Sequence, residues 1–142
     1  MKRTILHVLD INASIDKITN ALTTIEGLQG WWTGDTSGSA IQGGTINFNF
    51  ASVFNPIMQV VPCEPNKIQW ECVGGEKDWK GDKFFFVIEP ANGRTKLTFT
   101  QEYFNEITDE QYGRFNFNWG YYLNSLKQLC ETGKGMPFNT AK

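Results

Sequence analysis

The residue types that most often carry catalysis are few in this sequence and lie far apart. His7 is the only histidine, and the three cysteines, Cys63, Cys72 and Cys130, form no CxxC pair. One histidine and scattered cysteines cannot supply the usual ligand set of a zinc site. Nucleophile elbows, phosphate-binding loops and HExxH motifs do not occur in the chain. We therefore expect no catalytic residue, no metal and no cofactor.

The lone histidine sits in a stretch that alternates like a strand. Parity places His7 on the same face as Ile5 and Leu9. A single histidine in that position is more often a hydrogen-bonded sheet residue than a general base. Nothing else in the sequence supports a Ser-His-Asp triad built on it.

The carboxylates are plentiful, and the pattern places those next to the apolar runs on the outside. Glu71 and Glu102 are opposite in parity to the apolar residues of their strands, so we expect them at the surface. Asp109 and Glu110 fall in the first turn of a predicted helix, where acidic side chains favour the positive end of the helix dipole. No pair of carboxylates is predicted inside the protein.

Gln101 differs, because period-two alternation places its amide on the apolar face between Phe99 and Tyr103. A buried amide must find hydrogen bonds. Two interpretations stay open: a structural bond to the start of a helix or the end of the sheet, or a contact that orients the polar head of a ligand. Asn116, at the edge of a helical stripe, is a second candidate of this kind.

Aromatic rings, rather than reactive groups, dominate the C-terminal stretch "FNFNWGYYLNSLKQLCETGKG" (residues 115–135). At 100° per residue, six apolar side chains fall on one stripe: Tyr112, Phe115, Trp119, Tyr122, Leu126 and Leu129. Thr108 and Gln111 form a capping box, and Gly133 is typical of a helix end. The pattern predicts a helix from about residue 109 to about residue 132.

The stripe has two possible roles. Its rings can fill the core, as rings commonly do, or its aromatic half can line a ligand cavity, since such sites are mostly apolar. Phe117 and Tyr121 fall on the opposite side and are expected to face outward as an i, i+4 pair. Gly113 and Gly120 share one side of the helix, which suggests that a backbone, a ligand or another element comes close there.

The rest of the chain predicts the elements that would face this helix. Residues 2 to 9 read as a strand. Ser14 can cap a helix with apolar residues at 15, 18, 22 and 25, which Gly27 and Gly30 would break, and a short second helix is expected near 25 to 30. Trp31 and Trp32 follow in a glycine-rich turn and either gate an opening or close the core.

From there to Tyr103 the apolar residues recur with period two, as in "TINFNF", "KIQWECV", "DKFFFVIEP" and "TKLTFTQEY". Prolines and glycines between these runs mark hairpin turns. The result is an antiparallel meander with one apolar face, which the long helix must cover. We expect an α+β fold in which a curved sheet wraps the C-terminal helix, with two short helices after the first strand.

Length and composition bound the class of protein. The chain has 142 residues and a formal charge of −2, and no cluster of Lys and Arg appears. We expect one domain over residues 1–142, no nucleic-acid partner and no membrane insertion, because no apolar run approaches the roughly 20 residues that span a bilayer. An odd number of scattered cysteines favours reduced thiols and a cytoplasmic location.

Four stretches carry a resemblance to a known family: "ITNALTTIEGLQGWWT", "MQVVPCEPNKIQWECV", "NGRTKLTFTQEY" and "NWGYYLNSLKQLCETGKGMPF". In their order and spacing the chain resembles the START-like, birch-pollen-allergen-like superfamily, specifically the branch named after the activator of the 90-kDa heat-shock protein ATPase. The resemblance implies a helix-grip fold of seven antiparallel strands, two short helices and one long helix around an apolar cavity. Members of the superfamily carry lipids, sterols, plant hormones and polyketides, and a minority are cyclases or dehydratases.

We therefore expect non-catalytic binding of a small apolar molecule between the sheet and the C-terminal helix, by a monomer or weak homodimer. Two alternatives stay open: an interaction protein that engages a chaperone such as the 90-kDa heat-shock protein, and a cyclase-like enzyme. The predicted ligand-binding residues are Trp31, Trp32, Phe48, Trp70, Phe84, Phe86, Phe99, Gln101, Tyr112, Phe115, Asn116, Trp119 and Tyr122.

Overall fold

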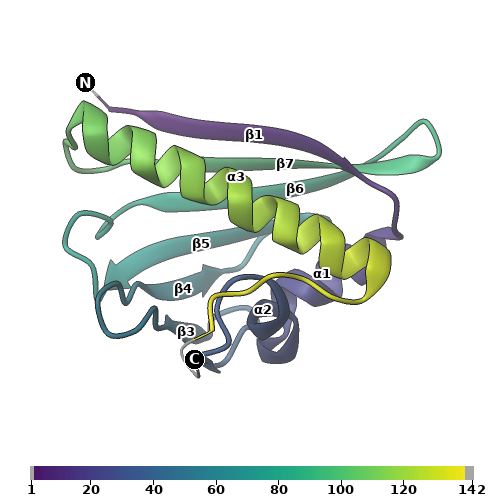
Figure 1. The fold of residues 1–142 in the computed structure, drawn as a ribbon, viewed down its shortest axis with the longest axis horizontal. Coiled ribbons are helices and arrows are strands. Elements are labelled where there is room, and N and C mark those ends of the chain that lie inside the picture. The colour runs from purple at the N-terminus through teal and green to yellow at the C-terminus, as the bar shows by residue number, and fades with distance from the viewer. Residues whose placement is uncertain (1, 140–142) are drawn as a thin grey trace.

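The protein is an α+β helix-grip fold, seen in a computed structural model that describes residues 2–139 (Figure 1). One antiparallel sheet has the strand order β1-β7-β6-β5-β4-β3-β2. Along the chain the elements are β1 (Thr4–Ile11), α1 (Ile15–Thr23), α2 (Ile25–Trp31), β2 (Thr36–Gly38), β3 (Thr45–Phe48), β4 (Ile57–Val61), β5 (Lys67–Gly74), β6 (Lys83–Ala91), β7 (Arg94–Glu102) and α3 (Asp109–Thr132).

The predicted meander is confirmed, and its alternation decides which face is buried. In β5, Ile68, Trp70 and Cys72 point into the core while their neighbours are partly exposed. Strands β6 and β7 repeat the pattern and pair over their full length. β1 closes one edge of the sheet by pairing with β7, and the three-residue strand β2 forms the other edge.

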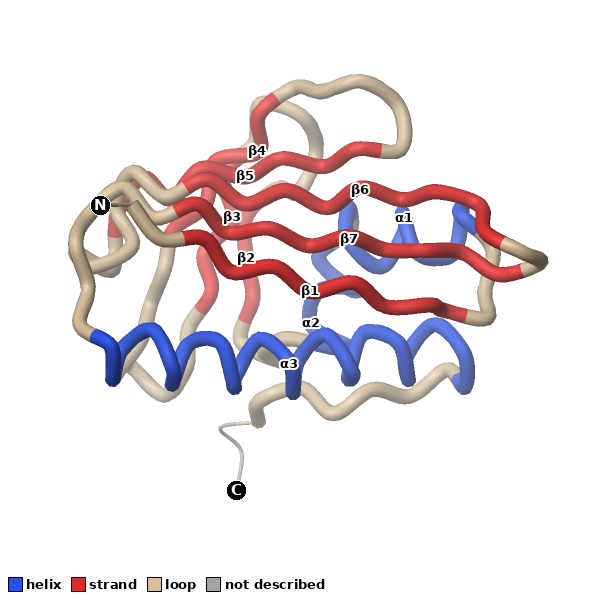
Figure 2. The backbone as a smooth tube through the Cα atoms, turned by 90° about the horizontal axis from the view of Figure 1, so that it is seen from above, coloured by secondary structure: helices blue, strands red, loops and turns tan. Residues whose placement is uncertain are grey.

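Helix α3 crosses the apolar face of the sheet and follows β1 along its length (Figures 1 and 2). Its start is the predicted capping box between Thr108 and Gln111, and Gly133 ends it with φ +88°. A left-handed residue at this position lets the chain leave the helix, and glycine adopts it without steric cost. The chain then turns back along the helix toward α2 (Figure 1).

The boundary between the two short helices differs from the prediction. Gly27 and Gly30 lie inside α2 rather than ending α1; the break occurs at Thr24, whose backbone is extended. The Thr24 hydroxyl accepts a hydrogen bond from the Gly27 amide and so caps α2. A Cβ atom at position 27 would lie 2.6 Å from the Ala21 Cα, so glycine is needed for close approach of the helices.

Two other expectations need correction in detail. The first strand spans residues 4–11 rather than 2–9, because pairing with β7 continues to Ile11. In the helical stripe, Trp119 and Leu126 are buried as expected, whereas the other four members are half-buried. The buried side of α3 also includes Leu123 and Cys130, so the stripe that meets the core is turned slightly from the predicted one.

The remaining general expectations concern thiols and membranes. All three cysteines are free, and burial raises the pKa of Cys72 and of Cys130 to about 11, which keeps both thiols protonated at neutral pH. Within residues 2–139, no helix is long and apolar enough to cross a membrane.

Candidate functional site

A pocket of about 340 Å³ opens beside the N-terminal half of α3. Eight of its nine lining residues are aromatic, contributed by α3, by the end of α2, by the loops after β3 and β5, and by the C-terminal segment. The lining residues are Trp32, Phe50, Phe54, Trp79, Phe115, Asn118, Trp119, Tyr122 and Phe138. A mostly apolar concave site with a few polar groups is typical of small-molecule binding.

Three nearly parallel indoles form the deep part of this pocket. Trp32 stacks on Trp119 with ring centroids 4.9 Å apart, and Trp79 lies 6.1 Å from Trp119 at an interplanar angle of 11°. All three side chains are at most 3% exposed. Their rigid, flat surfaces hold the shape of the pocket because indole rings have few rotatable bonds and pack in offset stacks.

The rim consists of rings carried by irregular segments. Phe50 and Phe54 flank a tight turn that is closed by main-chain hydrogen bonds from Phe50 to Phe54 and from Val53 to Phe50. Inside this turn Ala51 and Ser52 have φ values of +57° and +63°, which L-residues adopt at a steric cost. The turn thus holds two rings at the pocket at the expense of local backbone strain.

The C-terminal segment adds the last ring. The main chain of Phe138 donates to the Trp32 carbonyl and accepts from the Gly34 amide, at 2.8 Å and 2.9 Å. Upstream, the amide of Met136 donates to the buried hydroxyl of Ser125 on α3. These bonds place the Phe138 ring 5.5 Å from that of Phe50, at the edge of the pocket.

A buried polar chain lies behind the indoles. The Trp119 indole donates to the Gln101 carbonyl oxygen at 2.7 Å, and the Gln101 amide donates to Asp82 Oδ2 at 2.9 Å. The other oxygen of Asp82 accepts the Phe104 amide at 2.8 Å. The indole N–H can only donate, so it fixes the Gln101 amide with its NH2 toward Asp82. The structure therefore favours the structural interpretation of Gln101.

Asp82 is fully buried, and desolvation raises its carboxyl pKa from 3.8 to about 6, although its hydrogen bonds from Phe104 and Gln101 act in the opposite direction. Burial, with the charge of Asp82 as a second cause, also raises the pKa of Tyr103. The Trp79 indole N–H lies near the Tyr103 hydroxyl and acts to lower its pKa, yet neither group makes a hydrogen bond of normal geometry. Asp82 does not line the pocket, so Gln101 and Trp119 stand between this acid and any ligand.

The structure divides the thirteen predicted ligand-binding residues into three groups. Those that line the pocket are Trp32, Phe115, Trp119 and Tyr122. Those fully buried in the core and outside the pocket wall are Trp31, Phe48, Trp70, Phe84, Phe86, Phe99 and Gln101. The remaining two, Tyr112 and Asn116, lie on the other side of α3, where Tyr112 donates to the Thr4 carbonyl and Asn116 bonds to the ring of His7.

Sequence reasoning missed five pocket residues, Phe50, Phe54, Trp79, Asn118 and Phe138, and the buried Asp82. One signal was available: Trp79 and Phe138 are large rings in polar or glycine-rich stretches, and a ring in such a stretch usually packs against something. Asp82 carried no such signal, because a single aspartate before a strand is most often solvated. Among residues 2–139, no three His, Cys, Asp or Glu side chains are placed to hold a metal ion.

Comparisons with known proteins agree with this architecture. Residues 12–131 match the family described as activator of Hsp90 ATPase homolog 1-like protein. The solution structure of the Aha1 dimer from Colwellia psychrerythraea is similar to this chain, with 36% sequence identity and a TM-score of 0.83, over 94% of this chain and 99% of that one. No curated protein sequence matches the chain.

More distant structures share the fold alone. CalU16 from Micromonospora echinospora has 15% identity and a TM-score of 0.73, over 93% of this chain and 78% of its own. DynU16, a protein of the dynemicin biosynthetic locus, has 17% identity and a TM-score of 0.76, over 93% of this chain and 48% of its own. Both therefore support the helix-grip architecture that surrounds the pocket.

Proposed function

Because the chain belongs to the family of activator of Hsp90 ATPase homolog 1-like proteins, a branch of the START-like helix-grip fold, we propose that it binds a small apolar molecule in the ring-lined pocket. The observation that carries this proposal is the pocket itself: eight aromatic side chains around about 340 Å³, with Asn118 as the one non-aromatic residue of the wall. This volume is at the lower end of the range for sites of drug-sized ligands. A lipid chain or a flat, fused-ring compound suits such a wall.

The proposed role is binding without chemistry. A general acid or base must come within hydrogen-bond reach of the reacting group, and Asp82 is separated from the pocket by Gln101 and Trp119.

The free cysteines favour a reducing compartment, so we propose a cytoplasmic location.

The test is a pair of identical substitutions at neighbouring positions on α3. Tyr122→Asp places a charge in the apolar pocket wall, whereas Tyr121→Asp places it on the outward face, where Tyr121 is 47% exposed. We expect the affinity for an apolar fluorescent probe such as anilinonaphthalene sulfonate, and for a medium-chain fatty acid, to fall about tenfold or more only for Tyr122→Asp. Equal affinities for both variants and the wild type, with both variants folded by circular dichroism, would contradict the proposal.

A second candidate function is activation of a chaperone ATPase, which the description of the family names. The exposed rings of Phe117 and Tyr121 on the outer face of α3 offer an apolar contact for such a partner. The measurement is the ATPase rate of the 90-kDa heat-shock protein from the same host, with and without the protein. A rate increase that Phe117→Ala abolishes supports this candidate, and an unchanged rate removes it.

We also propose that the chain forms a homodimer. The support is the Colwellia relative, which is 36% identical over nearly the whole of both chains and is a dimer. Sedimentation velocity over a wide range of protein concentration tests this point, with a single monomeric species at every concentration as the contradicting result.

A further inference from the structure

The two edges of the sheet differ in how well they are protected. One edge, β2, is only three residues long, and the Thr36 carbonyl accepts from the side chain of Gln29. The other edge, β1, is eight residues long and contains no proline. Long edge strands with free main-chain groups pair readily with another strand, and proteins normally shorten or cover them.

The ladder with β7 shows which main-chain groups of β1 face outward. The main-chain amide of Tyr103 donates to the Arg3 carbonyl, so the odd-numbered residues of β1 bond to β7. In an antiparallel pair the alternate residues direct their N–H and C=O groups away from the partner strand. The even-numbered residues Thr4, Leu6, Val8 and Asp10 therefore present their main chain to the open edge.

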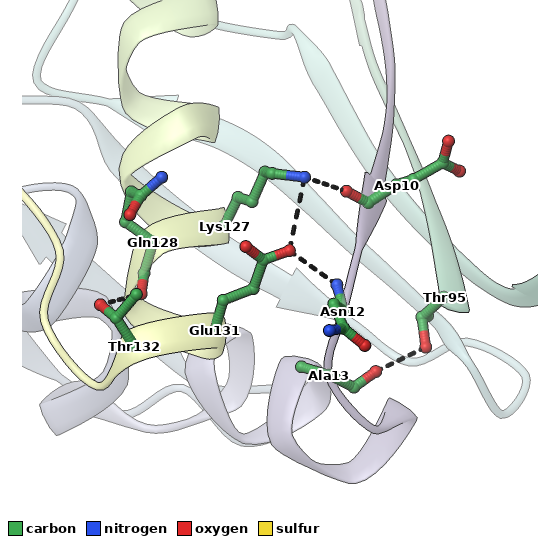
Figure 3. Close-up of polar contacts among 8 residues, drawn as sticks. All are labelled: Asp10, Asn12, Ala13, Thr95, Lys127, Gln128, Glu131 and Thr132. Atoms are coloured by element: carbon green, nitrogen blue, oxygen red, sulfur yellow. Dashed lines mark hydrogen bonds and ion pairs between the residues drawn. The ribbon is translucent and has the colours of Figure 1, made fainter. Parts of the chain in front are cut away.

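Helix α3 bonds to the main chain of this edge at both ends but not in the middle, where Asn116 reaches only the ring of His7. At one end the Tyr112 hydroxyl donates to the Thr4 carbonyl at 2.8 Å. At the other end Lys127 donates to the Asp10 carbonyl, and Glu131 accepts the Asn12 amide (Figure 3). In the part of the chain that the structure describes, no side chain or loop bonds to the main chain of Leu6 or Val8.

Leu6 and Val8 form an open window in the middle of β1, and their side chains are also apolar and exposed. Leu6 is 60% exposed and Val8 is 58% exposed, both on the sheet face opposite α3. Four free main-chain groups and two exposed aliphatic side chains lie side by side on one edge strand, which is the arrangement that strand addition uses. We infer that this window of β1 is the dimer surface, and that its occupant is the same strand of a second copy of the chain.

A second copy fits because the window is self-complementary. When two β1 strands run antiparallel about a two-fold axis at His7, Leu6 of one copy faces Val8 of the other, and all four open groups on each strand bond. Any other symmetric register moves Thr4 or Asp10, whose carbonyls α3 already occupies, into the window. In this register Lys2 lies diagonal to Asp10 of the second copy, so the charges at the ends of the interface attract.

One glycine of α3 agrees with the same arrangement. The two-fold axis places both α3 helices on one face of the joined sheet, next to each other. Gly113 and Gly120 lie on the β1 side of the helix; a Cβ at position 113 would meet nothing within 4 Å, and one at position 120 would lie 3.6 Å from the ring of His7. Gly113 therefore leaves room for the second helix, whereas His7 of the same chain already lies against Gly120.

This inference rests on the proposed homodimer, and the test separates the two. Sedimentation velocity compares the wild type with Leu6→Pro, Leu6→Lys and a control, Val73→Lys, which changes a valine on β5 that is 40% exposed. Proline at position 6 removes only an outward N–H, so the ladder with β7 survives. We expect both Leu6 variants to raise the dimer dissociation constant about tenfold or more, with the control unchanged.

Amide hydrogen exchange on the unmodified protein gives an independent reading. The amides of Leu6 and Val8 should be protected at high concentration and lose protection on dilution, whereas Ile5 and His7, which bond to β7, stay protected throughout. A dimer whose Leu6 and Val8 amides exchange freely, or that survives both Leu6 substitutions, overturns the β1 surface and leaves the dimer standing. A wild type that is monomeric at every concentration overturns both.

Discussion

The two flanks of helix α3 meet the rest of the protein by different means. The flank beside β1 is joined by directional polar contacts: Tyr112 to the Thr4 carbonyl, Asn116 to His7, and Lys127 to the Asp10 carbonyl. The other flank meets rings from loops, at Phe115, Asn118 and Tyr122, and there the pocket opens. The flank of α3 that faces the regular strand β1 is in direct contact with it. The flank that faces rings on irregular segments leaves the pocket between helix and rings.

The physical reason is shape. A strand presents carbonyls at a regular spacing along its edge, so side chains at helical intervals on α3 can reach them. Rings are rigid and pack edge to face, as Phe54 does against Trp79 at 4.8 Å and 89°. Eight of them converging from five segments do not fill the space completely. This comparison predicts that stability depends on the buried indoles, whereas ligand affinity depends on the rim.

The largest effect is expected where the two flanks meet the core. Trp119→Ala should lower the free energy of unfolding by about 3–5 kcal/mol, because the ring is 2% exposed and its removal leaves a cavity. Asn116→Ala, on the β1 flank, should cost about 1 kcal/mol or less through the lost contact with His7. Urea melts of both variants measure the difference. Equal losses would show that the polar flank holds the helix as firmly as the indole does.

The next effect is a pH dependence that comes from Asp82, the acid buried behind the pocket. Because the pKa of Asp82 is about 6 when folded and 3.8 in the ordinary state, the folded protein binds its proton more tightly. Asp82 therefore stabilises the folded state fully below about pH 4. As the pH rises through 6 this stabilisation is lost, and the free energy of unfolding falls by about 3 kcal/mol in total. Melts from pH 4 to pH 8 should show this loss in the wild type.

The control for that prediction is Asp82→Asn, which cannot titrate. The variant loses one hydrogen bond, since both Gln101 and Phe104 donate to this side chain, but its stability should lack the wild-type decline between pH 4 and pH 7. A decline of the same size in both proteins would assign the pH dependence to other groups.

A smaller effect tests the strained turn at the pocket rim. Ala51→Gly should stabilise the protein by about 1 kcal/mol, because glycine adopts the observed φ of +57° without steric cost. Ala91→Gly, in β6, is the control and should destabilise. Thermal melts decide, and a loss of stability with Ala51→Gly would mean that the turn is not strained.

The smallest predicted difference compares two hydroxyl groups on α3. Tyr112→Phe removes the bond to the Thr4 carbonyl and should cost about 0.5–1.5 kcal/mol. Tyr122→Phe keeps the ring at the pocket and should change the free energy of unfolding by less than about 0.5 kcal/mol. A larger loss of stability from Tyr122→Phe than from Tyr112→Phe would contradict the view that polar bonds hold the β1 flank of α3 and ring contacts hold the pocket flank.

The comparison also explains what could be predicted from the sequence. The strands could be predicted from their period-two alternation. Helix α3 could be predicted from its helical periodicity and from the capping residues Thr108, Gln111 and Gly133, so the fold follows from local patterns. The helical phase of Phe117, which is 75% exposed, and the strand parity of Gln101, which is buried, are likewise confirmed. These features depend on local geometry alone.

The pocket could be predicted only in part, because loops bring its walls together. Helical phase identified Phe115, Trp119 and Tyr122, but no periodicity relates Phe50, Trp79 or Phe138 to them. The same limit separates the lining rings from rings deep in the core. Trp70 contacts Trp32, and Phe99 contacts Trp119, yet neither Trp70 nor Phe99 lines the pocket. Residue type predicted apolar character, and only the tertiary arrangement decides which rings meet empty space.

The most direct test of ligand binding uses the five indole N–H signals as internal reporters. A two-dimensional nitrogen–proton spectrum is recorded during titration with a medium-chain fatty acid. We predict saturable shifts for Trp32, Trp79 and Trp119, which line the pocket, and small or no shifts for Trp31 and Trp70, which are buried behind it. Shifts of equal size in all five signals, or none in any of them across lipid and fused-ring probes, would contradict the proposal that this pocket binds an apolar molecule.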